Sequence, residues 1–194
     1  EAMFAQFVNQ AKKGAVMLDE VYTALRDKIR PDLPVATFGT SDLADIKVAN
    51  YRSAQGRSFA DFNTLNCELP APGFHTALNV AATAALLDML QTPIELALQA
   101  ALNTRGVARR FDFKGRTNAG AAVYDDYAHH PGELAATFDA VRTMGYNRVV
   151  VAFQPHTYTR TKALFDDFVR ELRKSDVLIL AEIYAARESN TVGI

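Results

Sequence analysis

Three loops carry most of the residues in this chain that could bind or react with a small molecule. Each loop follows a short apolar segment, and the loops at 125–131, 154–160 and 182–188 together hold carboxylates, arginines and three of the four histidines. Hard oxygen ligands suit Mg²⁺, and a guanidinium can hold a carboxylate through two parallel hydrogen bonds. The loops therefore indicate a site for a metal-bound phosphate and a carboxylate substrate.

The segments around these loops alternate between strand and helix patterns. We expect strands at 121–124, 148–153 and 177–181, with helices at 132–144 and 160–174 between them. This alternation is typical of right-handed crossovers that build a parallel sheet, and such sheets bind ligands beyond the carboxyl ends of their strands. The C-terminal part is therefore predicted to be an α/β domain with a parallel sheet and a site at that edge.

The first part of the chain resembles the end of a separate α/β or α+β domain. A helical pattern covers 2–13, and the connector at 69–73 reads Leu-Pro-Ala-Pro-Gly, which fits neither a helix nor a central strand. The remaining predicted elements are strands at 15–18, 34–38, 46–52 and 59–65 and helices at 75–90 and 93–102.

The composition is that of an ordinary globular protein, with 49% hydrophobic and 22% charged residues. A net charge of −1 gives no basic face, so we expect no nucleic-acid partner, and no apolar run is long enough for a membrane span. Cys67 is the one cysteine, so no internal disulfide forms, which favours a reducing, cytoplasmic compartment. Because Glu1 opens a helical pattern without a start methionine, we expect a piece of a longer protein.

Several of the candidate residues also have purely structural interpretations. Asp125 and Asp126 could cap the helix that follows them. Adjacent histidines such as His129 and His130 point to opposite sides of an extended backbone, which disfavours a zinc site. Structural roles also remain open for Arg109 and Arg110 as a solvated turn, Asp166 and Asp167 as solvent-facing charges, and His75 as a capping or core residue.

Four runs along the chain resemble motifs of a known enzyme family. They read PGFHTALNVAA at 72–82, GVARRF at 106–111, YDDYAHHP at 124–131 and FQPHTYTRT at 153–161. In this order and spacing they resemble the Mur ligases of peptidoglycan synthesis, and within that family the members that add L-alanine to UDP-N-acetylmuramate. The resemblance covers the chain from residue 70 onward, whereas residues 1–69 match only in general pattern.

The resemblance implies a three-domain, ATP-dependent ligase of which the chain holds a part. Residues 1–72 would be the remnant of a central α/β P-loop ATPase domain, 73–103 its helical end and linker, and 104–194 a truncated, Rossmann-like C-terminal ligase domain. In the family, ATP and Mg²⁺ convert the lactyl carboxylate of the UDP-sugar to an acyl phosphate, which the amine of L-alanine attacks. The pattern G-x-x-x-x-G-K-[ST] occurs nowhere here, so the chain alone is expected to be inactive without the N-terminal and P-loop regions of the same polypeptide.

The resemblance also implies roles for single residues. On the nucleotide side these are His75 and Asn79 at the adenine, Arg110 reaching the nucleotide and Asp126 at the ribose. On the amino-acid side they are Tyr127, His129, His156 and Arg160, with Arg160 as the partner of the alanine carboxylate and with His129 and Arg160 as catalytic residues. No residue is assigned to a metal.

Two positions depart from the family pattern. Thr76 and Thr157 stand where the family often has Asn and Arg, which affects part of the adenine contact and removes one positive charge from the acceptor site. Three other functions remain open: a related ligase that adds a tripeptide to the same UDP-sugar, a non-catalytic nucleotide-binding domain, and a metal-dependent hydrolase built on Asp125, Asp126, His129 and His130.

Overall fold

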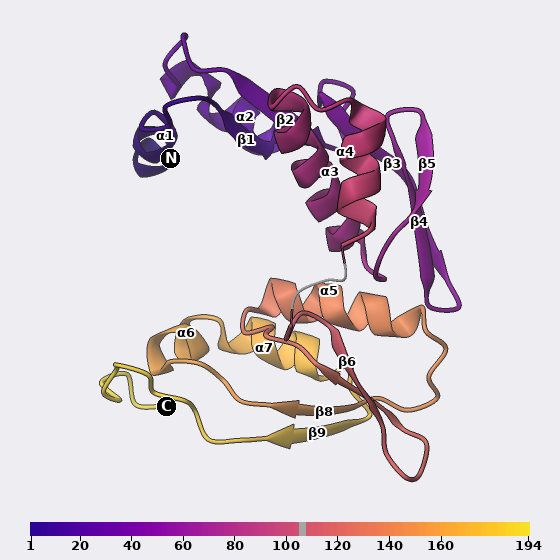
Figure 1. Cartoon of the computed structure of the whole chain (residues 1–194). Helices are drawn as coiled ribbons and strands as arrows, with labels where there is room; N and C mark the ends of the chain where they lie inside the picture. The colour runs from indigo at the N-terminus through magenta and orange to yellow at the C-terminus, as the bar shows by residue number, and fades with distance from the viewer. Residues whose placement is uncertain (105–107) are drawn as a thin grey trace. The chain divides into compact units, whose positions relative to one another are not determined.

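The chain forms two compact units, which meet in sequence at residues 105 and 106. The computed structural model describes residues 1–104 and 108–194. Each unit has its own strands (Figure 1) and its own cluster of buried apolar side chains. Within these described ranges, no helix is long and apolar enough to cross a membrane. The α/β class predicted from the sequence is confirmed in both units.

The first unit is built on a five-stranded sheet whose spatial order follows the chain. The first three strands pair in parallel, and the third, fourth and fifth pair antiparallel. The strands are β1 (Ala15–Leu18), β2 (Val35–Gly39), β3 (Ile46–Ala54), β4 (Arg57–Phe62) and β5 (Leu65–Glu68). The helices are α1 (Ala2–Val8), α2 (Asp19–Leu25), the 3₁₀ turn Arg26–Lys28, α3 (Phe74–Met89) and α4 (Ile94–Leu102).

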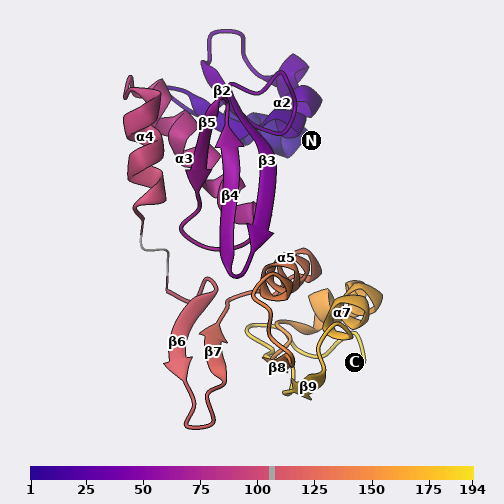
Figure 2. The same ribbon diagram turned by 90° about the vertical axis from the view of Figure 1, so that its right-hand side faces the viewer.

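Helix α3 packs against this sheet (Figure 2), and most of its buried residues are alanines. Ala77, Ala81 and Ala84 have no exposed surface, and Val48 and Phe62 of the sheet are almost fully buried beside them. Because alanine has a small side chain, the helix backbone can approach the sheet closely and leave few voids. Because the alanine face of α3 is buried, the opposite face of the helix is exposed, and His75 and Asn79 lie on it.

The second unit combines an antiparallel hairpin with a parallel strand pair. The hairpin consists of β6 (Asp112–Arg116) and β7 (Ala122–Asp125), and the parallel pair consists of β8 (Val150–Phe153) and β9 (Val177–Leu180). The helices are α5 (Pro131–Arg142), α6 (Tyr158–Ala163) and α7 (Phe165–Leu172). The core contains the buried side chains Leu134, Phe138, Phe153, Phe168 and Leu172.

The structure corrects the predicted strands in two places. The single strand predicted at 59–65 is two strands, β4 and β5, because the chain turns at Asn63, whose φ is +54°. The strand predicted at 121–124 is present as β7, but it pairs antiparallel with β6 rather than in parallel with β8 within the described residues. The parallel pairing expected for the strands after it is confirmed for β8 and β9.

The predicted helices are also shorter or divided. The helix expected at 2–13 ends at Val8. The helix expected at 160–174 is interrupted at Leu164, whose φ of −115° and ψ of 23° leave the helical range. Leu164 packs against the core of the second unit, so the chain changes direction there and α7 can bury Phe168.

Candidate functional site

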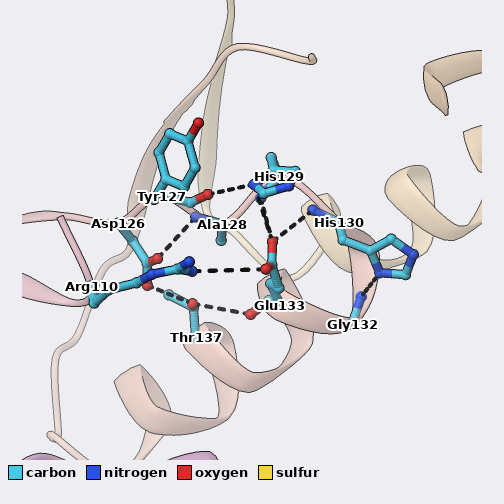
Figure 3. A network of polar contacts seen from close by, with 9 residues as sticks. All are labelled: Arg110, Asp126, Tyr127, Ala128, His129, His130, Gly132, Glu133 and Thr137. Carbon is cyan, nitrogen blue, oxygen red and sulfur yellow. Dashed lines mark hydrogen bonds and ion pairs between the residues drawn. The ribbon is translucent and has the colours of Figure 1, made fainter. Parts of the chain in front are cut away.

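The loop between β7 and α5 is held in shape by Asp126. Its Oδ1 accepts a hydrogen bond from the N–H of Ala128 at 2.9 Å, and its Oδ2 accepts one from Oγ1 of Thr137 at 2.9 Å (Figure 3). Because Thr137 lies on α5, this carboxylate ties the loop to the helix. The N-cap of α5 is His130, so Asp126 does not cap this helix, and it instead connects the loop to the helix.

Glu133, in the first turn of α5, accepts hydrogen bonds from the same loop. Its Oε2 accepts the N–H of His129 at 2.8 Å and that of His130 at 3.1 Å, and its Oε1 lies 3.8 Å from Nη1 of Arg110 (Figure 3). Burial raises the pKa of Glu133, but the backbone N–H donors of His129 and His130, the neighbouring His129 ring and the charge of Arg110 outweigh burial and leave this pKa below its ordinary value. Glu133 therefore stays ionised at neutral pH and connects Arg110 to the loop.

The two adjacent histidines have different environments. Nδ1 of His130 accepts the N–H of Gly132 at 3.2 Å, which completes a capping box with Glu133. Nδ1 of His129 lies 2.9 Å from the carbonyl oxygen of Tyr127 and 3.4 Å from Oε2 of Glu133. Since both neighbours of this nitrogen are acceptors, it carries the proton, and Nε2 of neutral His129 is left as an acceptor.

Arg109 and Arg110 lie in an exposed turn, as the structural interpretation predicts, and both also contact Tyr127. Their guanidinium carbons lie 4.7 Å and 5.6 Å from the centroid of the Tyr127 ring, and the N–H of Tyr127 donates to the carbonyl of Arg109 at 2.7 Å. Nε of Arg109 also lies 3.8 Å from Oδ2 of Asp125. These contacts bring Arg110, Asp126, Tyr127 and His129 together, although the motif at 106–111 begins with two residues outside the described part of the chain.

His156 and Arg160 lie four residues apart, before and within α6, and each has an unsatisfied buried polar atom. Nδ1 of His156 and Nη1 of Arg160 have no hydrogen-bond partner among the described residues. The ring centroid of His156 lies 6.1 Å from that of His129 and 5.5 Å from that of Tyr184. The structure therefore places the two predicted acceptor-side histidines near each other.

Residue 157, between these two side chains, has an unusual backbone conformation. Thr157 has a φ of +70° and a ψ of 142°, a combination that glycine adopts readily and a β-branched residue does not. Its N–H donates to the carbonyl of Tyr184 at 2.9 Å, and the N–H of Tyr184 donates to the carbonyl of Pro155 at 2.8 Å. The loop after β9 thus holds the turn that precedes α6.

The remaining predicted site residues, His75 and Asn79, lie on α3 in the first unit. They are one helical turn apart on an exposed face, and Thr76 between them is buried, with its Oγ1 3.4 Å from the carbonyl oxygen of Pro72. Gly73 precedes them with a φ of +112°, and a Cβ at this position would approach the His75 ring to 2.4 Å. Glycine is therefore required at this helix start.

The metal-centred alternative finds no support in the side-chain arrangement. Within residues 1–104 and 108–194, no group of three or more His, Cys, Asp or Glu side chains is arranged to hold a metal ion. Asp126 and His130 are instead used in the loop brace and the helix cap described above. Asp167 forms an ion pair with Arg170 at 2.7 Å on α7, in agreement with a solvent-facing charge.

Sequence reasoning gave no individual role to several residues that hold the site in shape, although two of them lie in the predicted site loop at 182–188. They are Thr137, Glu133, Tyr184 and Glu188. The spacing of Glu133 three residues after His130 is the pattern of a capping box and could have been found, whereas Tyr184 and Glu188 act on residues more than 25 positions away.

Comparison with known proteins places the chain in a family. Residues 109–191 match the model of the Mur ligase glutamate ligase domain. The UDP-N-acetylmuramate–L-alanine ligase of Thermobifida fusca is 39% identical over 179 residues, which cover 84% of this chain and 37% of that protein. The chain thus spans well under half the length of this relative.

Solved structures give the same assignment. The UDP-N-acetylmuramate–alanine ligase of Thermotoga maritima matches 95% of this chain and 48% of its own, with a TM-score of 0.66 and 26% identity. A MurF ligase from the same organism, solved in complex with ADP, matches 91% of this chain and 46% of its own with a TM-score of 0.67, and its 15% identity shows a shared fold. With its motifs, its fold and its relatives in agreement, the chain belongs to the Mur ligase family.

Proposed function

We propose that this chain is part of an ATP-dependent ligase that joins L-alanine to UDP-N-acetylmuramate. The observation that carries this proposal is the pair of unsatisfied buried atoms, Nδ1 of His156 and Nη1 of Arg160. A buried polar atom without a partner costs about 1–3 kcal/mol, and we assign the carboxylate of the amino acid to these two side chains, where Nη1 of Arg160 would donate to it. The 39% identity to an alanine-adding ligase agrees with this substrate.

In the proposed reaction, the γ-phosphoryl group of ATP is transferred to the lactyl carboxylate of the UDP-sugar. The neutral amine of L-alanine then attacks the carbonyl carbon of this acyl phosphate. The C–N bond forms, the C–O bond to phosphate breaks, and phosphate leaves with the electron pair while the nitrogen loses a proton. We assign the uptake of this proton to Nε2 of His129, because its Nδ1 already donates to the carbonyl of Tyr127.

Arg160 and His156 orient the amino acid in this scheme, and Tyr127 borders the same side of the site. Arg110 and Asp126 would bind the nucleotide. The guanidinium of Arg110 would supply a positive charge to it, and the carboxylate of Asp126 would accept a hydrogen bond from a ribose hydroxyl. Each oxygen of Asp126 accepts one hydrogen bond from the protein, which leaves a lone pair on each for a ligand. His75 and Asn79 of α3 are proposed at the adenine.

Mg²⁺ does not fit a dedicated site in the described residues, because no suitable group of ligands is present among them. We therefore assign the metal to the phosphates of the nucleotide and derive no step through it. For the domains, we propose that residues 1–72 and 73–103 belong to the central ATPase domain and 104–194 to the C-terminal ligase domain. The division of the chain at residues 105 and 106 supports this assignment.

Phosphate release tests the proposal. The complete protein encoded by the native gene is expected to release phosphate from ATP only when both L-alanine and UDP-N-acetylmuramate are present. The 194-residue chain under the same conditions is expected to release none, since its sequence lacks the phosphate-binding loop. If the complete protein turns over without L-alanine, or with a tripeptide in its place, the assigned substrate is wrong.

A further inference from the structure

Glu188, in the loop after β9, makes a two-point contact with the start of α6. Its Oε2 accepts the N–H of Thr159 at 2.9 Å, and its Oε1 accepts Oγ1 of Thr159 at 2.5 Å. The two residues are 29 positions apart, so this contact joins two of the loops that carry the predicted site. Thr159 directly precedes Arg160.

We infer that Glu188 is a positioning residue of the acceptor site: by clamping Thr159 it fixes the direction in which His156 and Arg160 meet an α-amino-acid carboxylate. This inference rests on the proposed function, and it adds a residue that touches neither the amino acid nor the nucleotide.

The short length of α6 makes such a clamp necessary. The helix has six residues and ends at Ala163, too few turns to hold its own first turn rigidly. Its N-cap, Thr157, makes no side-chain capping bond and has a strained backbone. Without an external acceptor, the N–H of Thr159 would be one of the unsatisfied donors of the helix start.

The way Glu188 uses its oxygens leaves Arg160 available. Both oxygens accept from Thr159, while Nη1 of Arg160 keeps no partner among the described residues. The hydroxyl and then the N–H of Thr159, with a contribution from the charge of Arg160, hold the pKa of Glu188 below its usual value. The carboxylate therefore stays ionised and can restrain the segment without neutralising the guanidinium through a direct bond.

Tyr184 supplies the second point at which the same loop holds this turn. Its N–H donates to the carbonyl of Pro155 and its carbonyl accepts the N–H of Thr157, so these two bonds flank His156. The 182–188 loop thus holds the backbone on both sides of His156 and directly before Arg160. Of these contacts, only the Glu188 contact depends on a side chain, so it can be removed by substitution.

The first experiment measures the clamp itself in the complete protein. Hydrogen–deuterium exchange is followed by mass spectrometry in a peptide that covers 157–163, for the native protein and for Glu188→Ala and Glu188→Gln. Glu182→Ala is the matched control, because it removes a carboxylate from the same loop, and among residues 1–104 and 108–194 the bond made by Glu182 uses its backbone carbonyl, which accepts from Gln154. We expect Glu188→Ala to speed exchange in this peptide about tenfold, Glu188→Gln to speed it less, and the control to leave it unchanged.

The second experiment separates positioning from folding by steady-state kinetics on the same variants. Glu188→Ala is expected to raise the KM for L-alanine about 5- to 20-fold, with the KM for ATP within about twofold of the native value. Thr159→Ala, which loses the hydroxyl bond but keeps the N–H bond to Glu188, is expected to raise the KM for L-alanine by a smaller factor, and Thr159→Ser, which keeps the hydroxyl, is expected to retain the native value.

Three results would overturn the inference. The first is faster exchange with an unchanged KM for L-alanine, the second is an equal rise in both KM values, and the third is an equal effect of the Glu182 control. A native protein that ligates no amino acid would refute the proposed function as well, whereas an active native protein with an unaffected Glu188→Ala variant would refute this inference alone.

Discussion

Replacing Arg160 with alanine in the complete ligase separates substrate binding from structural support. Nη1 of Arg160 is buried and makes no hydrogen bond within the described chain. Truncating the side chain therefore removes no hydrogen bond at that nitrogen, and we expect the free energy of unfolding to change by less than about 1 kcal/mol. If Arg160 only supported the fold, its removal would lower the free energy of unfolding and leave the KM for L-alanine unchanged.

The expected loss in binding follows from the bond that a carboxylate would make. A charge-assisted hydrogen bond contributes about 1.5–3 kcal/mol, which corresponds to a rise of about 10- to 150-fold in the KM for L-alanine. The KM for ATP is expected to stay within about twofold, because Arg160 is assigned to the amino acid. Arg160→Lys keeps the charge but loses the planar fork, so its KM should fall between those of the native enzyme and the alanine variant.

The assay is the initial rate of phosphate release, with one substrate varied and the other two saturating, together with thermal unfolding of each variant. Arg173→Ala is the matched control, because Arg173 is an exposed arginine just after α7. An unchanged KM for L-alanine in Arg160→Ala would refute the assignment of this residue. If Arg160→Ala lowers the unfolding temperature more than Arg173→Ala does and raises the KM for both L-alanine and ATP, Arg160 supports the fold, and the inference drawn from its unsatisfied nitrogen is wrong.

Three further predictions concern the electrostatics and the core. The lowered pKa of Glu133 contributes stability that is fully present above the unfolded-state pKa near 4.5 and is lost as pH falls through the folded-state pKa. The free energy of unfolding in urea should therefore fall less between neutral and acid pH for Glu133→Gln than for the native chain. Equal falls in the two proteins would contradict the contacts described for Glu133. Burial and the hydrogen bond that the Tyr124 hydroxyl donates to Tyr146 raise the pKa of Tyr124 to about 12, so this contribution to stability is present below pH 10 and is lost as pH rises through about 12. Ultraviolet titration should find a lower pKa for Tyr124 in Tyr146→Phe, and an unchanged titration would exclude the bond. Ala84→Leu should cost about 1–3 kcal/mol by overfilling the contact between α3 and the sheet, whereas Thr83→Leu on the exposed face should cost far less in the same urea unfolding experiment.

The elements with a clear apolar pattern were predictable, and those without one were not. The strand at 150–153 and the alanine-rich helix at 74–89 carry that pattern in their own residues. The strand β6 reads Asp-Phe-Lys-Gly-Arg, which has a single apolar side chain and no alternation, so its pairing with β7 follows from the turn at 117–120 rather than from hydrophobicity. The break at Leu164 was missed because a leucine there fits a continuous helical pattern equally well.

For the candidate site, residue types and loop order were readable from the sequence, but the supporting contacts were not. His129 and His156 could be placed in two neighbouring loops because both loops follow strand patterns. Which nitrogen of His129 carries the proton depends on the carbonyl of Tyr127 and the carboxylate of Glu133, and no composition rule gives those distances. The clamp from Glu188 is set by tertiary structure alone, because it spans 29 positions.

Two unfavourable features meet at the start of α6, and together they explain why this segment is suited to binding rather than to stability. Thr157 holds a backbone conformation that costs a β-branched residue about 1–3 kcal/mol, and the side chains of His156 and Arg160 beside it each keep an unsatisfied buried atom. Folding alone offsets neither cost, since the bonds from Tyr184 and Glu188 restrain the segment without satisfying those atoms. In the proposed function the amino-acid carboxylate would be bound by these two side chains, while the bonds from Tyr184 and Glu188 hold the turn in place. The segment is thereby organised before the ligand arrives, so less of the binding free energy is spent on ordering it.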